Sequence, residues 1–187
     1  PIKGTSKRVE EDKQKDERNK ADLLHSAKDR SENVMVVDLV RNDLAKVCKE
    51  GTVAVDELYG IYSFPQVHQM ISTISGELNK GISFSAIMKA AFPMGSMTGA
   101  PKRRVMELIE QYEQTKRGIF SGALGYIDPD GDFDFNVVIR SIMYNANTSY
   151  LSFETGSAIT FYSDPEKEWE ECLLKAAAIK TVLQNRG

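Results

Sequence analysis

Three side chains near the end of the sequence have types and spacing that could support chemistry. Glu168, Glu171 and Lys175 occur at i, i+3 and i+7, which places them on one face of a helix. Two carboxylates and an ammonium on such a face could hold a hard cation beside an anionic substrate. The simpler interpretation is a Glu171–Lys175 surface ion pair, which contributes only a few tenths of a kcal/mol.

Two other charged residues, Glu32 and Arg140, could add to such a site from distant segments. Glu32 could supply a further carboxylate; its simpler role is a favourable interaction with the dipole at the start of a helix. Arg140 falls on the face of an alternating strand opposite that of the aromatic residues. A guanidinium there needs a carboxylate partner, and the sequence leaves open whether the protein or a ligand provides it.

The glycine-rich segment 95–102 reads GSMTGAPK. It does not form a phosphate-binding P-loop, because its glycines are too close together and Pro101 lacks a backbone N–H. The backbone amides of Thr98, Gly99 and Ala100 immediately precede a predicted helix and could hold a single carboxylate. The alternative is an ordinary tight turn at the entry to a helix.

Two further side chains, Lys3 and His68, are candidates for a catalytic role. Lys3 lies between Ile2 and Gly4, and burial there would lower its pKa and allow the neutral amine to act as a nucleophile. An exposed lysine is the commoner case. His68 is predicted to share one face of an alternating strand with Met70, Ser72 and Ile74, and a lone histidine in a strand is usually structural. The two histidines and two cysteines show no spacing that supports a zinc site.

The overall composition is that of an ordinary globular protein. The 187 residues are enough for one domain with a sizeable core or for two small ones, and they are 41% hydrophobic and 27% charged. A net charge of −3 argues against nucleic acid as a partner, and the chain has no apolar run long enough to span a membrane. The separated cysteines favour a reducing cytoplasm. Because the sequence opens with Pro1 and not methionine, we expect it to be a piece of a longer protein.

The periodicity of the sequence predicts an α+β fold of mainly antiparallel strands flanked by helices. The charged run 9–24 is either a solvated helix or a loop. Helices are predicted over 31–51, over 83–91, which Ser83 could cap, over 101–112 and from 163 onward, and strands over 52–58, 67–78, 119–127, 133–143 and 150–161. Residues 1–8 are expected to form an extended or turn segment. The sequence Asp-Pro-Asp-Gly at 128–131 is a strong signal for a hairpin turn.

Three of the predicted helices carry apolar stripes, which predict the faces that are buried. The stripes are Val37, Val40, Leu44 and Val47; Val105, Leu108, Ile109 and Tyr112; and Trp169, Cys172, Leu173, Ala176 and Ala177.

Seven sequence blocks, taken together and in order, resemble the chorismate-utilising enzyme family. They are PIKGT (1–5), SAKDRSENVMVVDLVRNDL (26–44), VHQMISTISGEL (67–78), FPMGSMTGAPK (92–102), GIFSGALGYID (118–128), NVVIRS (136–141) and SDPEKEWEE (163–171). The resemblance covers essentially the whole chain and is greatest to the aminodeoxychorismate synthase branch. That branch has a lysine in PIKGT, at Lys3, where anthranilate synthases typically have alanine.

The resemblance implies a magnesium site formed by Glu32 and Glu171, with Glu168 close by in the same motif. Chorismate is a dianion, so a divalent cation, Arg140 and Lys175 would together offset the repulsion between the substrate and the carboxylates. Mg²⁺ takes few protein carboxylates and keeps positions open for substrate and water, which suits this ligand set.

The resemblance also implies which residues contact the substrate. Lys175 and the turn 98–100 match positions that hold the ring carboxylate, and Arg140 matches the arginine that pairs with the enolpyruvyl carboxylate. His68 matches a histidine that lines the ring pocket. Lys3 matches the lysine that adds to ring carbon C2 and expels the C4 hydroxyl, before ammonia enters at C4.

The activity implied is Mg²⁺-dependent amination of chorismate to 4-amino-4-deoxychorismate, in p-aminobenzoate and folate biosynthesis, with ammonia from a glutamine amidotransferase subunit. Residues 1–187 would form the C-terminal part of a single chorismate-binding catalytic domain. Near the implied substrate wall, Gly156 is followed by Ser157, Ala158 and Ile159, where many members have a glycine triplet. The alternatives are an anthranilate, isochorismate or salicylate synthase, and a non-catalytic structural or partner-binding segment.

Overall fold

The computed structural model describes residues 1–161 and 163–184, and the chain divides into two units, Pro1–Glu113 and Gln114–Gly187. Both units combine helices with antiparallel strand pairs, which confirms the predicted α+β class. Among the helices in the described ranges, none is both long and apolar enough to cross a lipid bilayer.

The first unit is built on a three-stranded antiparallel sheet. Strand β3 (Val67–Ser75) lies between β1 (Ile2–Lys7) and β2 (Ala54–Ser63). Along β3, every second side chain from His68 to Ser72 is buried, as the alternation of a half-buried strand requires.

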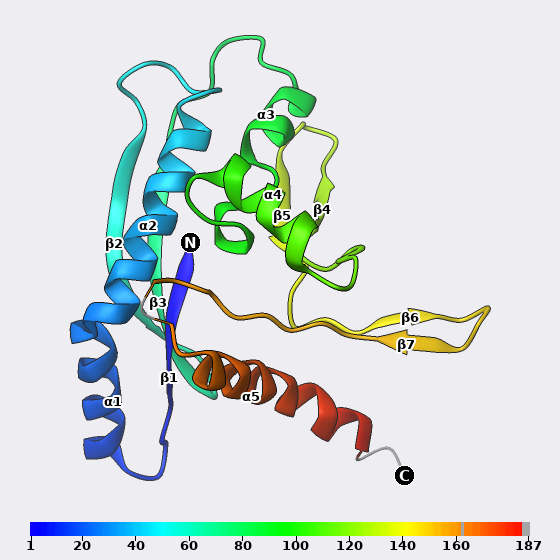
Figure 1. The fold of residues 1–187 in the computed structure, drawn as a ribbon. Coiled ribbons are helices and arrows are strands. Elements are labelled where there is room, and N and C mark those ends of the chain that lie inside the picture. The colour runs from blue at the N-terminus through cyan, green and yellow to red at the C-terminus, as the bar shows by residue number, and fades with distance from the viewer. Residues whose placement is uncertain (162, 185–187) are drawn as a thin grey trace. The chain divides into compact units, whose positions relative to one another are not determined.

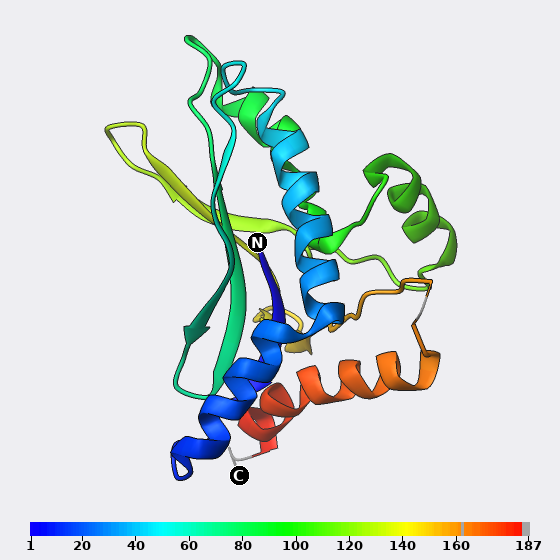
Figure 2. The same ribbon diagram turned by 90° about the vertical axis from the view of Figure 1, so that its left-hand side faces the viewer.

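Two helices pack against this sheet. Helix α1 (Lys13–His25) is capped by Asp12, and helix α2 (Ala27–Leu44) is capped by Ser26, whose side chain accepts from a backbone N–H of the first turn. Figures 1 and 2 show α2 running alongside β1 and β3. The charged run 9–24 is therefore helical from Lys13 onward, with residues 9–12 forming a turn before the helix.

The remaining helices of the first unit follow the sheet. Helix α3 (Phe84–Ala91) begins at Ser83, whose side chain accepts from the N–H of Ala86, as predicted. A short 3-10 helix, η1 (Gly95–Met97), packs against α2 and leads into α4 (Lys102–Tyr112). A small apolar cluster lies beneath α3 and consists of Val47, Cys48 and Ala90, packed with Leu44, Val53 and Ile82.

The second unit begins with a hairpin of β4 (Ala123–Ile127) and β5 (Phe133–Val137). The predicted turn forms between them because the Asp128 carboxylate accepts from the backbone N–H groups of Asp130 and Asp132, at 3.0 and 2.9 Å. A second hairpin pairs β6 (Met143–Asn145) with β7 (Tyr150–Ser152).

The second unit ends in the long helix α5 (Pro165–Gln184). Its predicted buried stripe is largely wrong: Ala176 is buried, but Trp169 is 64% exposed and Leu173 is also exposed. Glu168 and Ile179 are buried instead. Helix α4 likewise has no fully buried residue, and Tyr112 is 68% exposed. A stripe of apolar residues marks a candidate face, and burial of that face depends on what packs against it.

Gly95 allows η1 to approach α2. A Cβ added at Gly95 would lie 2.8 Å from the Cβ of Leu39, closer than real side chains come. We expect Gly95→Ala to lower the free energy of unfolding by about 1–3 kcal/mol, because α2 and η1 would have to separate. Urea titration of the complete protein measures this. The control is Ser96→Ala on the same turn, which adds no atom; equal stability of both variants would contradict the prediction.

Candidate active site

Lys3 lies at an irregularity in the edge of the sheet. Ile2 pairs with Ile71 of β3, but Thr5 pairs with Gln69, so β1 has one residue more than its partner over this stretch. This is a β-bulge formed by Lys3 and Gly4. Lys3 is partly exposed.

Gly4 is required at this bulge for two reasons. Its φ of +96° is one that side-chain-bearing residues rarely adopt, and an added Cβ would lie 3.0 Å from the Cβ of Asp29 and 3.1 Å from Leu23. The bulge therefore brings the backbone of Lys3 and Gly4 close to helices α1 and α2.

Asn33, on helix α2, is the side chain that reaches Lys3. Its amide nitrogen lies 3.4 Å from the carbonyl oxygens of both Lys3 and Met70, and its amide oxygen accepts from the hydroxyl of Ser72 at 2.6 Å. Asn33 is fully buried. The sequence analysis gave neither Asn33 nor Ser72 a role in the site, although Asn33 lies four residues before Val37 of the predicted apolar stripe and Ser72 shares the strand face of His68. A polar residue within an apolar stripe was the available signal.

Glu32 precedes Asn33 in the second turn of α2. Its side chain is 18% exposed and lies 3.9 Å from the ammonium of Lys28. Because the helix begins at Ala27, the first-turn position nearest the helix dipole belongs to Asp29, so that simpler role for Glu32 is not supported.

The turn 98–100 differs from the prediction in one respect. The N–H of Thr98 donates to the Gly95 carbonyl at 3.3 Å, and its hydroxyl donates to the Met94 carbonyl at 3.1 Å. The amide of Thr98 is thus used within the turn. In the described part of the chain, the amides of Gly99 and Ala100 show no such bond.

Asp43 attaches this turn to helix α2. Its buried carboxylate pairs with Lys102, the first residue of α4, at 2.5 Å and with Lys46 at 3.0 Å. The sequence reasoning missed Asp43. Removing one partner of a buried pair leaves an uncompensated charge, so this contact holds the 98–100 turn firmly against α2.

His68 is buried between β3 and helix α1. Its Nδ1 lies 2.8 Å from the Ser63 hydroxyl, and its Nε2 lies 3.0 Å from the Asp16 carboxylate. Both ring nitrogens of His68 therefore have partners within the protein. The next residue, Gln69, lies on the opposite face of the strand. A role for His68 beside a substrate ring stays a prediction.

In the second unit, the segment 155–157 is attached to helix α5 by three side-chain hydrogen bonds. The Thr155 hydroxyl donates to the Cys172 carbonyl at 3.3 Å, and the Ser157 hydroxyl donates to Glu168. The Lys175 ammonium donates to the carbonyl of Gly156 at 2.9 Å.

These bonds gather four predicted site residues. Lys175 also pairs with Glu171 at 2.6 Å, so Glu168, Glu171 and Lys175 share one face of α5, as their spacing predicts, and Gly156 in the preceding segment lies beside that face. The surface ion pair considered from the sequence is therefore present, and its ammonium is also held by the Gly156 carbonyl.

Arg140 lies outside the strand in which the sequence placed it. Strand β5 ends at Val137, and Arg140 is exposed, with a φ of +50°. The prediction that alternation sets its direction is therefore wrong, because the backbone leaves the extended conformation before it.

The carboxylates predicted to hold a metal ion are divided between the two units. Glu32 lies in the first, and Glu168 and Glu171 lie in the second. In the described residues, no group of three or more His, Cys, Asp or Glu side chains is arranged to hold a metal. Mg²⁺ is typically held by one or two carboxylates, with water and substrate completing its coordination, so partly exposed glutamates fit this ion by their chemistry.

Comparison with known proteins establishes the family. Residues 1–181 match the chorismate binding enzyme family. The chain belongs to this family. The match covers both structural units and all the predicted site residues.

Three curated relatives align over 98% of the chain. They are the aminodeoxychorismate synthase of Streptomyces pristinaespiralis (45% identical, 25% of its length covered), aminodeoxychorismate synthase component 1 of Escherichia coli strain K12 (40%, 40% of its length) and anthranilate synthase component 1 of Aquifex aeolicus (39%, 37% of its length). The chain spans between about a fifth and two fifths of the curated relatives it matches.

The fold matches that of a solved structure. The menaquinone-specific isochorismate synthase of Escherichia coli superimposes with a TM-score of 0.84 at 24% identity, over 97% of this chain and 41% of that one. This likeness shows the fold alone.

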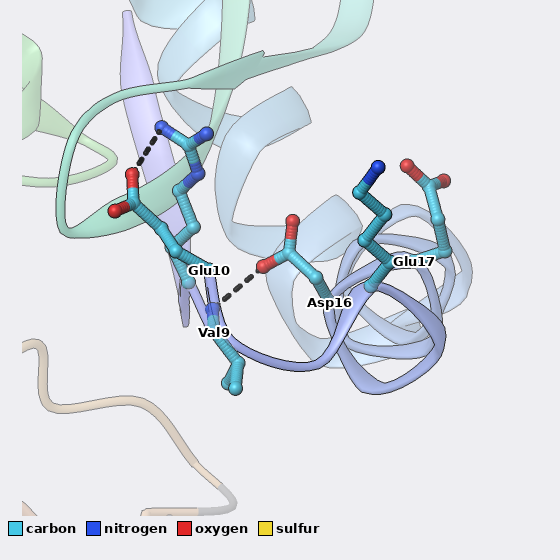
Figure 3. Close-up of a pocket in the computed structure, with 6 residues that line it drawn as sticks. Val9, Glu10, Asp16 and Glu17 are labelled. Atoms are coloured by element: carbon cyan, nitrogen blue, oxygen red, sulfur yellow. Dashed lines mark hydrogen bonds and ion pairs between the residues drawn. The ribbon is translucent and has the colours of Figure 1, made fainter.

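Asp16 carries the attachment of helix α1 to β1 and β3. Figure 3 shows its carboxylate directed at the N–H of Val9, beside a surface pocket that also includes the Arg8–Glu10 ion pair. The Val9 N–H, at 2.7 Å, is the main reason that the pKa of Asp16 is lowered; His68 and Arg8 act in the same direction, and desolvation opposes them.

A lowered pKa in the folded state predicts how the contribution of Asp16 to stability depends on pH. The contribution is present above the ordinary carboxylate pKa, about 4, and is lost as the pH falls through the lower folded value. We expect Asp16→Asn to lower the urea midpoint at pH 7, and the difference from wild type to shrink below pH 4. Asp22→Asn, an exposed change on the same helix, is the control. A difference independent of pH would count against this assignment.

Proposed function

We propose that this chain is part of an aminodeoxychorismate synthase, which converts chorismate and ammonia to 4-amino-4-deoxychorismate and water. The observation that carries the proposal is Lys3, the residue that distinguishes this branch, placed on a bulge beside the helix that bears Glu32. Identities of 45% and 40% to two relatives with this name support it. The activity belongs to the complete protein, of which residues 1–187 would form the C-terminal part of a single catalytic domain.

In the proposed reaction, Lys3 is a transient nucleophile. Its neutral amine adds to ring carbon C2, the double bonds shift, and the C4 hydroxyl leaves as water after taking up a proton. Ammonia then adds at C4 while the bond from C2 to the lysine nitrogen breaks, which restores the ring diene and frees Lys3. Partial exposure of Lys3 on an edge strand leaves its amine accessible for both steps.

The charged residues would bind the chorismate dianion. We assign Glu32, Glu168 and Glu171 to a Mg²⁺ site; the ion would offset the negative charge of the substrate. Arg140 would pair with the enolpyruvyl carboxylate, and Lys175 with the ring carboxylate. The Gly156 carbonyl orients the Lys175 ammonium, since it accepts from that ammonium at 2.9 Å.

The uncharged residues of the proposed site shape its wall. The turn of Thr98, Gly99 and Ala100 would offer the amides of its last two residues to the ring carboxylate, with Asp43 and Lys102 holding the turn in place. Gly156 would let the substrate approach the backbone closely, since an added Cβ there meets nothing within 4 Å. His68 would support the ring pocket from within the sheet.

The proposed partner is a glutamine amidotransferase subunit that delivers ammonia. The product would serve p-aminobenzoate and folate synthesis, and the proposed location is the cytoplasm; a plant relative is named as chloroplastic. Anthranilate synthesis is the second candidate, because the Aquifex aeolicus relative is nearly as similar as that of Escherichia coli.

The first test identifies the product. The complete protein, incubated with chorismate, Mg²⁺ and an ammonium salt, should yield 4-amino-4-deoxychorismate by mass spectrometry. Lys3→Ala should lower the rate on the order of 10³-fold or more, because no other amine replaces the nucleophile. Lys7→Ala, an exposed change on the same strand, should leave it unchanged. Anthranilate and pyruvate as products would instead favour the second candidate, and failure of the complete protein to bind chorismate would favour a non-catalytic segment.

The second test concerns the metal. Glu171→Gln keeps the shape of the side chain but removes its charge, so the Mg²⁺ concentration for half-maximal binding should rise roughly 10- to 100-fold. Calorimetric titration of the complete protein with Mg²⁺ measures this, and Glu32→Gln should show the same change. Glu170→Gln, an exposed neighbour on α5, provides the matched control. If all three variants bound Mg²⁺ like the wild type, the assigned ligands would be wrong.

A further inference from the structure

Strand β3 is flanked by a bulge on each side at nearly the same level. On β1, Lys3 and Gly4 fill the place opposite one residue of β3. On β2, the pairing shifts between Glu57 and Gly60, which adds one residue at Leu58–Tyr59. The residues of β3 between the two bulges are 70–72. Bulges disrupt the ladder of backbone hydrogen bonds and redirect side chains.

At each bulge a backbone group loses its partner in the sheet. The buried side chains of Asn33 and Ser72 replace those partners. On β1, the Lys3 carbonyl receives the amide of Asn33 at 3.4 Å. On β2, the N–H of Tyr59 donates to the Ser72 hydroxyl at 3.0 Å, and this hydroxyl in turn donates to Asn33 at 2.6 Å. Asn33 and Ser72 are 0% and 1% exposed, so water does not compete for these bonds.

Helix α2 also contacts the β2 bulge, through the ring of Tyr59. Tyr59 has a φ of +61°, an unfavourable conformation for a side-chain-bearing residue, and the guanidinium of Arg30 lies 4.7 Å above the centre of its ring. Arg30 is on α2, three residues before Asn33. Helix α2 therefore contacts both bulges, through Asn33 on β1 and through Arg30 on β2.

We infer that Asn33 is a positioning residue for Lys3: its amide fixes the bulge that presents the amine and sets the distance between the Lys3 backbone and the helix that carries Glu32. This inference rests on the proposed function, because it assigns a purpose to the position of Lys3. Asn33 is fully buried, so it has no surface to offer a substrate. It acts through the Lys3 carbonyl, and Gly4 allows the close approach that this bond requires.

The substitution Asn33→Asp separates this role from simple packing. Aspartate has nearly the same shape, and in its ionised form it only accepts, so that an oxygen in place of the donor would face the carbonyls of Lys3 and Met70 at about the same distance. The bulge then loses its donor while the core keeps its volume. The control is Asn79→Asp, the same chemical change at an exposed residue, because Asn79 also donates from its side chain to a backbone carbonyl, that of Cys48 at 3.2 Å, away from the bulges.

The experiment compares both variants of the complete protein with the wild type in three measurements. These are the urea midpoint, kcat and KM for chorismate, and the rate at which a limiting amine-acylating reagent labels Lys3 relative to Lys7, read by mass spectrometry of peptides. For Asn33→Asp we expect kcat to fall about 10- to 100-fold with KM changed less than about threefold, and the labelling ratio to change at least about threefold. Asn79→Asp should lose stability without changing either the ratio or kcat.

The inference is overturned if Asn33→Asp is folded and matches Asn79→Asp in kcat and in the labelling ratio. If Asn33→Asp does not fold, Ser72→Ala is used in its place, because loss of the Ser72 hydroxyl frees the Asn33 amide to turn. An unchanged Lys3-to-Lys7 labelling ratio in Ser72→Ala would also overturn the inference. If the wild type makes a different product, the proposed function fails, but the labelling ratio still reports whether Asn33 sets the position of Lys3.

Discussion

Helix α2 carries two buried polar side chains that must find partners, and much of the first unit is arranged to supply them. An unsatisfied buried polar group costs about 1–3 kcal/mol, and an unpaired buried charge costs more. Asn33 is satisfied by the sheet, and Asp43, ten residues further along the helix, is satisfied by Lys46 and Lys102. The helix is thereby tied at one end to β1 and β3 and at the other to the start of α4.

This arrangement explains how parts of the candidate site that are far apart in sequence are connected through one helix of the first unit. Lys3 belongs to a strand held by Asn33, Glu32 is next to Asn33, and the turn before Lys102 is held by Asp43. Two glycines make the approach possible, since side chains at Gly4 or Gly95 would collide with the helices. The same frame would serve any chemistry in the family, so it supports the family assignment more directly than the choice of product.

Local signals in the sequence predicted the elements whose causes are local. The Ser83 cap, the turn at Asp128 and the alternation along β3 each depend on neighbouring residues, and each is confirmed. The bulge at Lys3 could not be predicted, because it depends on the partner strand and on a helix 30 residues away. Arg140 was misplaced for a similar reason: its sequence alternates, but the pairing that would extend β5 ends at Val137.

The charged residues of the candidate site show why the sequence could suggest a site but not decide its use. Glu32 lies near Lys28 and Glu171 pairs with Lys175, in partly exposed positions where such pairs contribute about 0–1 kcal/mol. A ligand can replace the partner in such a weak ion pair at little cost in free energy. Breaking the ion pairs of the buried Asp43 would cost much more. If the Glu171 carboxylate turned from Lys175 to a cation, the Lys175 ammonium could pair with an anion instead. The hydrogen bond to the Gly156 carbonyl would still keep that ammonium in position. The interaction that looks least informative in the sequence, an i,i+4 ion pair, is thus the one best suited to a site that must accept opposite charges together.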